Sequence, residues 1–219
     1  MNDYLTWDEK TITDFSPENI NSLYNEGYVF TRKEKGIMNQ TRSVRIDLSH
    51  FELSSENRRI LKKTKGIEIK SHALPYSGYS WQIGKLAKDF YETKFGEGTF
   101  SANKIKELLT EKEKSNFNTL FTYCLNSGIL GYSICFETPE MVHYSYPFYD
   151  LTTSPKDMGL GMMTKAILFA KENGKKFIYL GSAQRPSDTY KFQFSGVEWF
   201  DGKKWTSNVE ELKNVLQKV

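Results

Sequence analysis

Hydrophobic and polar residues follow two different periods along the chain, which predicts a mixture of strands and helices. The alternation is clearest at 43–51, where Val44, Ile46 and Leu48 alternate with polar neighbours, and this predicts a half-buried strand. Other apolar stretches predict strands at 28–33, 67–74, 117–125, 129–137, 143–151 and 175–182.

Turn signals connect some of these strands. Asn126-Ser127-Gly128 separates two apolar stretches and is typical of a hairpin. With the strand at 143–151 the hairpin predicts a three-stranded meander, in which Pro147 marks a bulge or an edge position. Asp201-Gly202 predicts a last hairpin near the C-terminus.

Helix start and stop signals complete the outline. Ser and Asn residues at starts, with Gly at ends, predict helices at 16–27, 54–66, 79–95, from Ser101, at 162–174, and from Asn208 to 219. In the helix at 79–95, Trp81 belongs to the expected apolar side. Residues 1–15 lack periodicity and are expected to be an irregular lead-in.

A glycine-containing turn links the strand at 143–151 to the helix at 162–174. It ends in Lys156-Asp157-Met158-Gly159-Leu160-Gly161. Glycines before a helix allow close backbone approach, and the N–H groups of the first turn favour an anion. A turn that uses glycine only for tight packing is the alternative.

This spacing, Lys156-x-x-Gly159-x-Gly161, resembles the R/Q-x-x-G-x-G/A pattern of GNAT-type acyltransferases, with Lys in the first place. Tyr190 follows the next strand, where that superfamily often carries an acid tyrosine. The resemblance implies that Lys156, Gly159, Leu160 and Gly161 bind the acyl donor.

Composition excludes several classes of protein. The chain has 219 residues, 15% aromatic residues and a net charge of only +3, which favours a packed globular protein and gives no sign of nucleic-acid binding by itself. Cys124 and Cys135 form no CxxC pair, and the three histidines are scattered, so no metal site is expected. No signal peptide or membrane span is visible, and a cytoplasmic protein is expected.

Positive charge is concentrated in one place. Arg58, Arg59, Lys62 and Lys63 lie on one predicted helix, and Arg45 lies on the strand before it. Clustered Lys and Arg can neutralise nucleic-acid phosphates, whereas most charged runs are solvated helix faces. Both interpretations stay open on spacing alone.

The succession of short motifs from about 27 to 205 resembles the arginyl- and leucyl-tRNA–protein transferases of the N-degron pathway. The matching segments are RIDLSHF at 45–51, SSENRRILKK at 54–63, FYD at 148–150, GLG at 159–161, YLG at 179–181, Tyr190-Lys191-x-x-Phe194 with Glu198, and Trp205. The chain departs from that family in having no cysteine within positions 1–40 and in having Gly196 where the family has proline. The metal or iron–sulfur binding associated with those cysteines is therefore not expected here.

The resemblance implies an α/β fold with a degenerate N-terminal GNAT-like half at 1–95 and an active GNAT-like half at 96–219. It implies an acyltransferase of class EC 2.3 that moves an amino acid from aminoacyl-tRNA to the N-terminal amine of a protein or peptide, which could be acidic. Its donor is aminoacyl-tRNA, without a separate cofactor. Candidate catalytic residues are Tyr190 as an acid, Asp150 to orient or deprotonate the amine, and Tyr149 beside it.

The candidate substrate- and tRNA-binding residues are Arg45, Arg58, Arg59, Lys62, Lys63, Lys191 and Glu198. The alternatives are an acetyl-CoA-dependent N-acetyltransferase, which the glycine turn supports equally well, and a non-catalytic tRNA- or peptide-binding module. A Fem-type transferase that adds amino acids to wall peptides lies between them.

Overall fold

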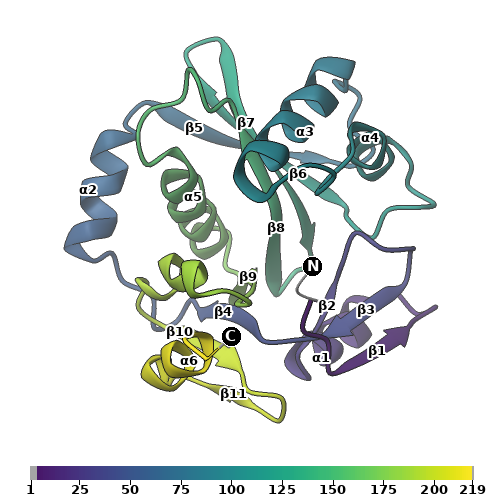
Figure 1. Cartoon of the computed structure of the whole chain (residues 1–219), viewed down its shortest axis with the longest axis vertical. Coiled ribbons are helices and arrows are strands. Elements are labelled where there is room, and N and C mark those ends of the chain that lie inside the picture. Colours follow the sequence, from purple (N-terminus) through teal and green to yellow (C-terminus); the bar gives the residue numbers. More distant parts are fainter. Residues whose placement is uncertain (1–3, 219) are drawn as a thin grey trace.

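A computed structural model describes residues 4–218 of the protein. In this part of the chain eight strands form one mixed sheet in the order β11-β10-β4-β9-β8-β7-β6-β5 (Figure 1). These strands are β4 (Ser43–Asp47), β5 (Ile67–Ala73), β6 (Thr119–Leu125), β7 (Gly128–Glu137), β8 (Met141–Tyr149), β9 (Phe177–Ser182), β10 (Val197–Phe200) and β11 (Trp205–Thr206). A smaller sheet of order β1-β3-β2 contains β1 (Asp8–Thr11), β2 (Tyr28–Phe30) and β3 (Ile37–Gln40).

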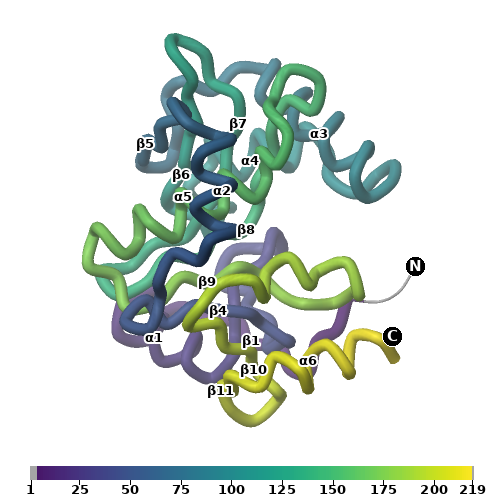
Figure 2. Tube along the Cα trace, turned by 90° about the vertical axis from the view of Figure 1, so that its left-hand side faces the viewer, coloured from purple at the N-terminus to yellow at the C-terminus, as the bar shows by residue number. Residues whose placement is uncertain are grey.

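Helices cover both faces of the large sheet. They are α1 (Pro17–Asn25), α2 (Ser55–Lys63), α3 (Trp81–Phe95), α4 (Ala102–Thr110), α5 (Met158–Glu172) and α6 (Val209–Leu216), with a 3-10 helix η1 (Pro186–Phe192). One core packs α1, α3 and α4 against one face, and a second core packs α5 against the other. Figure 2 shows α2 beside α5.

The helix starts predicted at Ser16, Ser54, Ser101 and Asn208 are confirmed, because capping is a local property of the sequence. The Ser54 hydroxyl accepts the Asn57 N–H at 3.1 Å, and the Asn57 side chain accepts the Ser54 N–H at 3.1 Å. At the start of α1 the Ser16 hydroxyl accepts the Asn19 N–H. Gly174 ends α5 at a φ of 69°, in the left-handed region that glycine favours.

Three predictions about single elements are wrong. β1 lies inside the expected irregular lead-in, because it pairs with β3 rather than following a local pattern. β4 is buried on both faces, Arg45 included, because it lies between β10 and β9 at the inside of the sheet. Trp81 is 68% exposed instead of facing the core.

α5 begins four residues earlier than the predicted 162. Asp157 precedes it with a φ of 67°, and Gly159 and Gly161 therefore lie within the first turn of the helix. The glycines are part of the helix surface rather than of a loop in front of it.

The meander, the crossover helix and the next strand are arranged as the acyltransferase resemblance predicts. β6, β7 and β8 are antiparallel neighbours, and α5 then crosses to β9, which runs parallel to β8. β8 and β9 pair only from Met141 to His143 and from Phe177 to Tyr179. The α/β, GNAT-like fold class is confirmed by this succession.

The predicted division into halves at residue 95 stays a prediction, and the large sheet does not follow it. β4 and β5 come from before residue 95, yet β4 lies between β10 and β9 and β5 lies beside β6. Strands from both sides of the boundary thus share one sheet.

Candidate active site

The candidate site lies where β8 and β9 diverge, and we call this place the fork. Beyond His143 and Tyr179 the two strands no longer pair. Ser145 is an extra residue on β8, because Tyr144 faces Cys135 of β7 and Tyr146 faces the preceding Ile134. Pro147 follows this bulge, in the part of β8 that has lost its β9 neighbour, as its ring and missing N–H predict. Successive parallel strands that diverge leave backbone groups available between them.

Lys191 holds η1 on the end of β9. The residue is only 7% exposed, and its ammonium donates to the Ser182 carbonyl at 2.5 Å and lies 3.7 Å from a carboxylate oxygen of Asp188. These internal partners explain why a lysine can be buried here. We therefore assign Lys191 to positioning η1 rather than to the predicted contact with substrate.

Tyr190, the neighbouring residue on η1, is 46% exposed. Burial raises the pKa of Tyr144 and of Tyr149, and the nearby Tyr190 adds to both effects. Tyr190 thus lies in one region with two tyrosines of β8. Tyr91 of α3 reaches the same strand and donates its hydroxyl to the Pro147 carbonyl at 3.0 Å.

The two glycines at the start of α5 pack against protein side chains. A Cβ on Gly161 would lie 2.5 Å from the Thr64 methyl group, and one on Gly159 would lie 3.2 Å from the Tyr149 hydroxyl. Gly161 therefore allows α5 to approach the end of α2, which supports the packing alternative at this position. Tyr149 is half-buried against Gly159 and Phe90, as a wall of the fork.

Asp150 caps the loop between β8 and α5. Its carboxylate accepts the N–H of Thr152 at 2.7 Å, and the hydroxyls of Thr152 and Thr153 at 2.6 and 2.8 Å. These hydrogen bonds lower the pKa of Asp150 to about 2. A carboxylate with such a pKa is a weak base, so we assign Asp150 to the loop and not to proton transfer.

Arg45 and Glu198 form an internal pair instead of a substrate surface. The Arg45 Nε donates to Glu198 at 2.8 Å, and its Nη1 donates to the Asn25 side chain at 3.0 Å. The guanidinium also lies over the rings of Phe177 and Trp205. Arg45 is 7% exposed, so we do not retain either residue as a tRNA contact.

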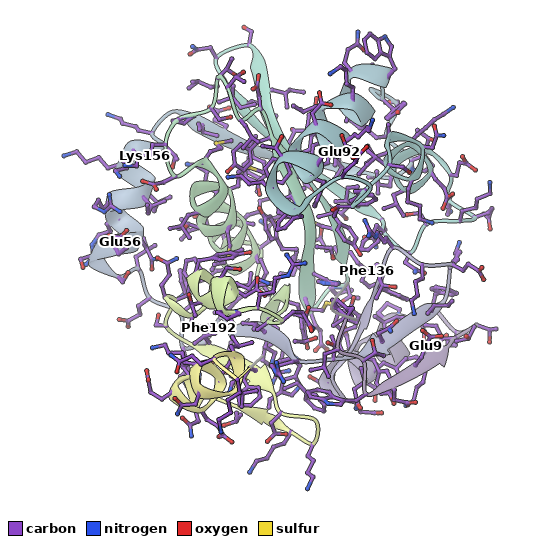
Figure 3. All side chains as sticks on the ribbon, in the orientation of Figure 1. Glu9, Glu56, Glu92, Phe136, Lys156 and Phe192 are labelled. Atoms are coloured by element: carbon purple, nitrogen blue, oxygen red, sulfur yellow. The ribbon has the colours of Figure 1, made fainter. Side chains whose placement is uncertain are left out.

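The remaining residues predicted to bind tRNA phosphates lie on the surface of the basic helix α2. Arg58, Arg59, Lys62 and Lys63 are exposed, although Arg59 pairs with Glu56 and Lys63 lies 2.6 Å from Asp157. Lys156 is exposed as well, and Figure 3 shows it on the same side of the molecule as Glu56. The predicted phosphate-binding helix and the first turn of α5 are therefore neighbours.

Two further features of the fork lie outside the sequence predictions. Tyr4 donates its hydroxyl to the Ser182 hydroxyl at 2.7 Å, which brings the N-terminal segment to the end of β9. His143, at the last paired position, is buried and lies 2.8 Å from the Tyr24 hydroxyl through Nδ1, and burial lowers its pKa to about 3. In the sequence, only the aromatic segment at 143–149 could have indicated the buried contact between His143 and Tyr24.

No protein-family model matches the chain. Two curated proteins similar to it are aspartate/glutamate leucyltransferases. The one from Ruegeria pomeroyi is 22% identical over 171 residues, and the one from Helicobacter hepaticus is 23% identical over 155 residues. The chain is therefore similar, at low identity, to members of an aminoacyltransferase family.

The matches cover 74% and 64% of this chain but 60% and 58% of the two relatives, so the chain spans about three fifths of their length. Solved structures that resemble it include L-PGS from Bacillus licheniformis, at 15% identity, and FemX, at 10% identity. Their TM-scores are 0.49 and 0.45, and the similarity covers 76% of this chain in both cases and 52% and 60% of theirs. These TM-scores are low, so the fold class rests on the strand order described above.

Every helix between residues 4 and 218 is too short or too polar to cross a bilayer.

Proposed function

We propose that the protein moves an amino acid from aminoacyl-tRNA to the N-terminal amine of a protein or peptide. The observation that supports this most is the contact between α2 and the start of α5. The basic helix lies against the first turn of α5 through Lys63 and Asp157 and through Thr64 and Gly161. A tRNA bound through its phosphates to α2 would thus reach the fork with its 3′ end.

The reaction needs little covalent chemistry from the protein. The neutral amine attacks the ester carbonyl carbon, a C–N bond forms, and the C–O bond to the terminal ribose breaks. One proton leaves the amine and one is taken up by the departing ribose oxygen, which gives a peptide amide and free tRNA. Since the ester is already activated, holding the two reactants together accounts for most of the catalysis.

Tyr190 is the group that we propose to donate to the departing oxygen. Its half-exposed ring lies on η1, in the region of Tyr144 and Tyr149 of β8, and its hydroxyl forms no hydrogen bond with another residue of 4–218. Lys191, the next residue, is held inside by Ser182 and Asp188, which fixes the segment that carries Tyr190.

The names of the two relatives suggest leucine as the transferred residue and aspartate or glutamate at the acceptor N-terminus. We propose these as the first substrates to assay. The test uses purified protein, tRNA charged with radiolabelled leucine, and peptides that differ only in their first residue, Asp, Glu, Ala or Lys. Incorporation of label into the acidic peptides is the expected result.

Acetyl-CoA is the matched control donor, because the N-terminus of α5 could also hold a pyrophosphate. Acetyl transfer to the peptides without tRNA binding would identify an N-acetyltransferase instead. Binding of tRNA without transfer of any amino acid would identify a binding module.

A further inference from the structure

A buried tyrosine of β8 carries a hydroxyl group without a partner. Tyr144 is 2% exposed, and its hydroxyl forms no hydrogen bond within residues 4–218. Buried polar groups in proteins are nearly always paired, because an unpaired one loses its hydration without compensation. A phenylalanine would fill the same space without this cost, so packing alone does not explain the hydroxyl.

The position of Tyr144 is the apex of the fork. It directly follows His143, the last residue of β8 that pairs with β9. The next residue, Ser145, is the bulge and carries a second buried hydroxyl without a partner. Two unpaired hydroxyl groups are therefore adjacent in the chain where the β-ladder ends.

A neighbouring buried tyrosine, Tyr123, has a hydroxyl that is paired with a backbone carbonyl. Tyr123 of β6 is fully buried in the same cluster, and its hydroxyl donates to the Met162 carbonyl at 3.1 Å. Burial raises the pKa of Tyr144, and a polar contact between its hydroxyl and the Tyr123 hydroxyl partly opposes this rise. The two hydroxyls nevertheless do not meet hydrogen-bond geometry, so Tyr123 leaves Tyr144 unpaired.

We propose that the Tyr144 hydroxyl donates a hydrogen bond to the carbonyl oxygen of the aminoacyl ester at the apex of the fork. The inference rests on the proposed function and deepens it, because it names a catalytic residue for that reaction. Tyr144 transfers no proton; it stabilises the charge that develops on this oxygen when the amine attacks. A substrate carbonyl entering between the diverging strands would break no β-ladder hydrogen bond.

The chemistry of the group fits this role. A tyrosine hydroxyl is protonated at neutral pH already at its ordinary pKa of 10.0, and burial raises the pKa of Tyr144 further. A neutral donor in a desolvated place acts strongly on a developing oxyanion. Loss of one such donor typically lowers kcat on the order of 10²–10³-fold. The donor is also held in place, since its ring is enclosed by the second core.

The test compares Tyr144→Phe with the matched control Tyr123→Phe. For Tyr144→Phe we expect a kcat at least about tenfold lower with an unchanged or raised melting temperature. For Tyr123→Phe we expect a lowered melting temperature and a kcat within threefold of wild type, measured where the variant is fully folded. A Tyr144→Phe variant that keeps kcat within threefold of the wild type overturns the inference. A lowered melting temperature together with full activity at a lower temperature also overturns it, because the hydroxyl would then be structural.

A non-reactive probe separates this inference from the proposed function. Adenosine that carries a leucyl group on a 3′-amide presents the same carbonyl and cannot transfer it. If the wild type transfers nothing from charged tRNA, the proposed function fails, and binding of this probe decides the role of Tyr144. Weaker binding by Tyr144→Phe than by the wild type supports the subsite. Equal binding by both proteins, or no binding by the wild type, overturns it.

Discussion

The Lys63 ammonium lies 2.6 Å from a carboxylate oxygen of Asp157, a residue 94 positions away in the chain. This ion pair connects the exposed basic helix α2 to the residue that precedes α5. Arg59 also has a carboxylate partner, Glu56. Arg58 and Lys62 have none within residues 4–218, so their charges are the more available ones for a phosphate.

We expect tRNA binding to depend most on Arg58 and Lys62. Their double replacement by Gln should flatten the slope of log affinity against log salt concentration by about 1.4–1.8, since each neutralised phosphate contributes roughly 0.7–0.9. The matched double variant at Arg59 and Lys63 should change the slope less. Fluorescence anisotropy with labelled tRNA between low and moderate salt measures both slopes. Equal slopes for wild type and the Arg58/Lys62 variant would show that these two residues bind no phosphate and that α2 is a solvated helix face.

The close approach of α5 to α2 predicts a stability effect at Gly161. Gly161→Ala would place a methyl group 2.5 Å from the Thr64 Cγ2, and such overpacking costs about 1–3 kcal/mol, partly offset by the better helix propensity of Ala. Thr64→Ser removes that methyl group and should recover part of the loss. Urea denaturation of the two single variants and the double variant measures the coupling. Additive effects of the two substitutions would show that the contact is not the cause.

The local signals of the sequence predicted the elements that depend only on neighbouring residues. Ser54 and Asn57 lie three positions apart and satisfy each other's backbone groups, so the start of α2 could be read directly. The meander and its crossover to β9 were predictable for a similar reason, because a hairpin turn and one helix connect the strands.

The position of β4 could not be predicted, because its partners come from β9 and β10, at least 130 residues later in the chain. Arg45 looked like the polar side of a half-buried strand. Its partners Asn25 and Glu198 come from distant segments, and only the assembled sheet shows that the charge is internal. The Asp150 side chain, in contrast, pairs with Thr152 and Thr153, two and three positions later, and the loop-cap alternative was visible from the sequence.

We expect Asp150 to affect stability at neutral pH and to leave the shape of the pH–rate profile unchanged. Its folded pKa of about 2 lies below the ordinary value of 3.8, so its contribution is fully present above pH 4 and is lost as the pH falls towards 2. Asp150→Ala should therefore be destabilised by a constant amount from pH 5 to 8, and by less at pH 3. Denaturation at each pH and the transfer rate from pH 6 to 9 test this. Loss of an acidic limb from the rate profile would instead make Asp150 a base.

The buried pair of Arg45 and Glu198 predicts a structural effect without a binding effect. Glu198→Ala would leave the buried Arg45 guanidinium without its counter-charge. We expect this to lower the free energy of unfolding by about 3 kcal/mol. The value is at the low end for broken buried pairs, because the Glu198 side chain is 27% exposed. Glu210→Ala removes the exposed partner of Lys213 and should cost no more than about 1 kcal/mol. Both variants should keep the salt slope of tRNA binding. A changed salt slope in a folded Glu198→Ala variant would show that Glu198 or Arg45 takes part in tRNA binding after all.

Tyr190→Phe is the sharpest test of the proposed acid. The substitution keeps the ring and removes a hydroxyl that forms no hydrogen bond within residues 4–218, on a residue that is 46% exposed. Stability should therefore change by less than about 0.5 kcal/mol, whereas turnover should fall roughly 10²–10⁴-fold, the usual range for a positioned proton donor. Tyr149→Phe is the matched control, since its hydroxyl faces the Gly159 N–H, and its turnover should fall much less. Single-turnover transfer from charged tRNA separates these chemical effects from product release. If Tyr190→Phe loses less than threefold, or if the two variants lose equally, Tyr190 is a wall of the fork and the ribose oxygen takes its proton from elsewhere.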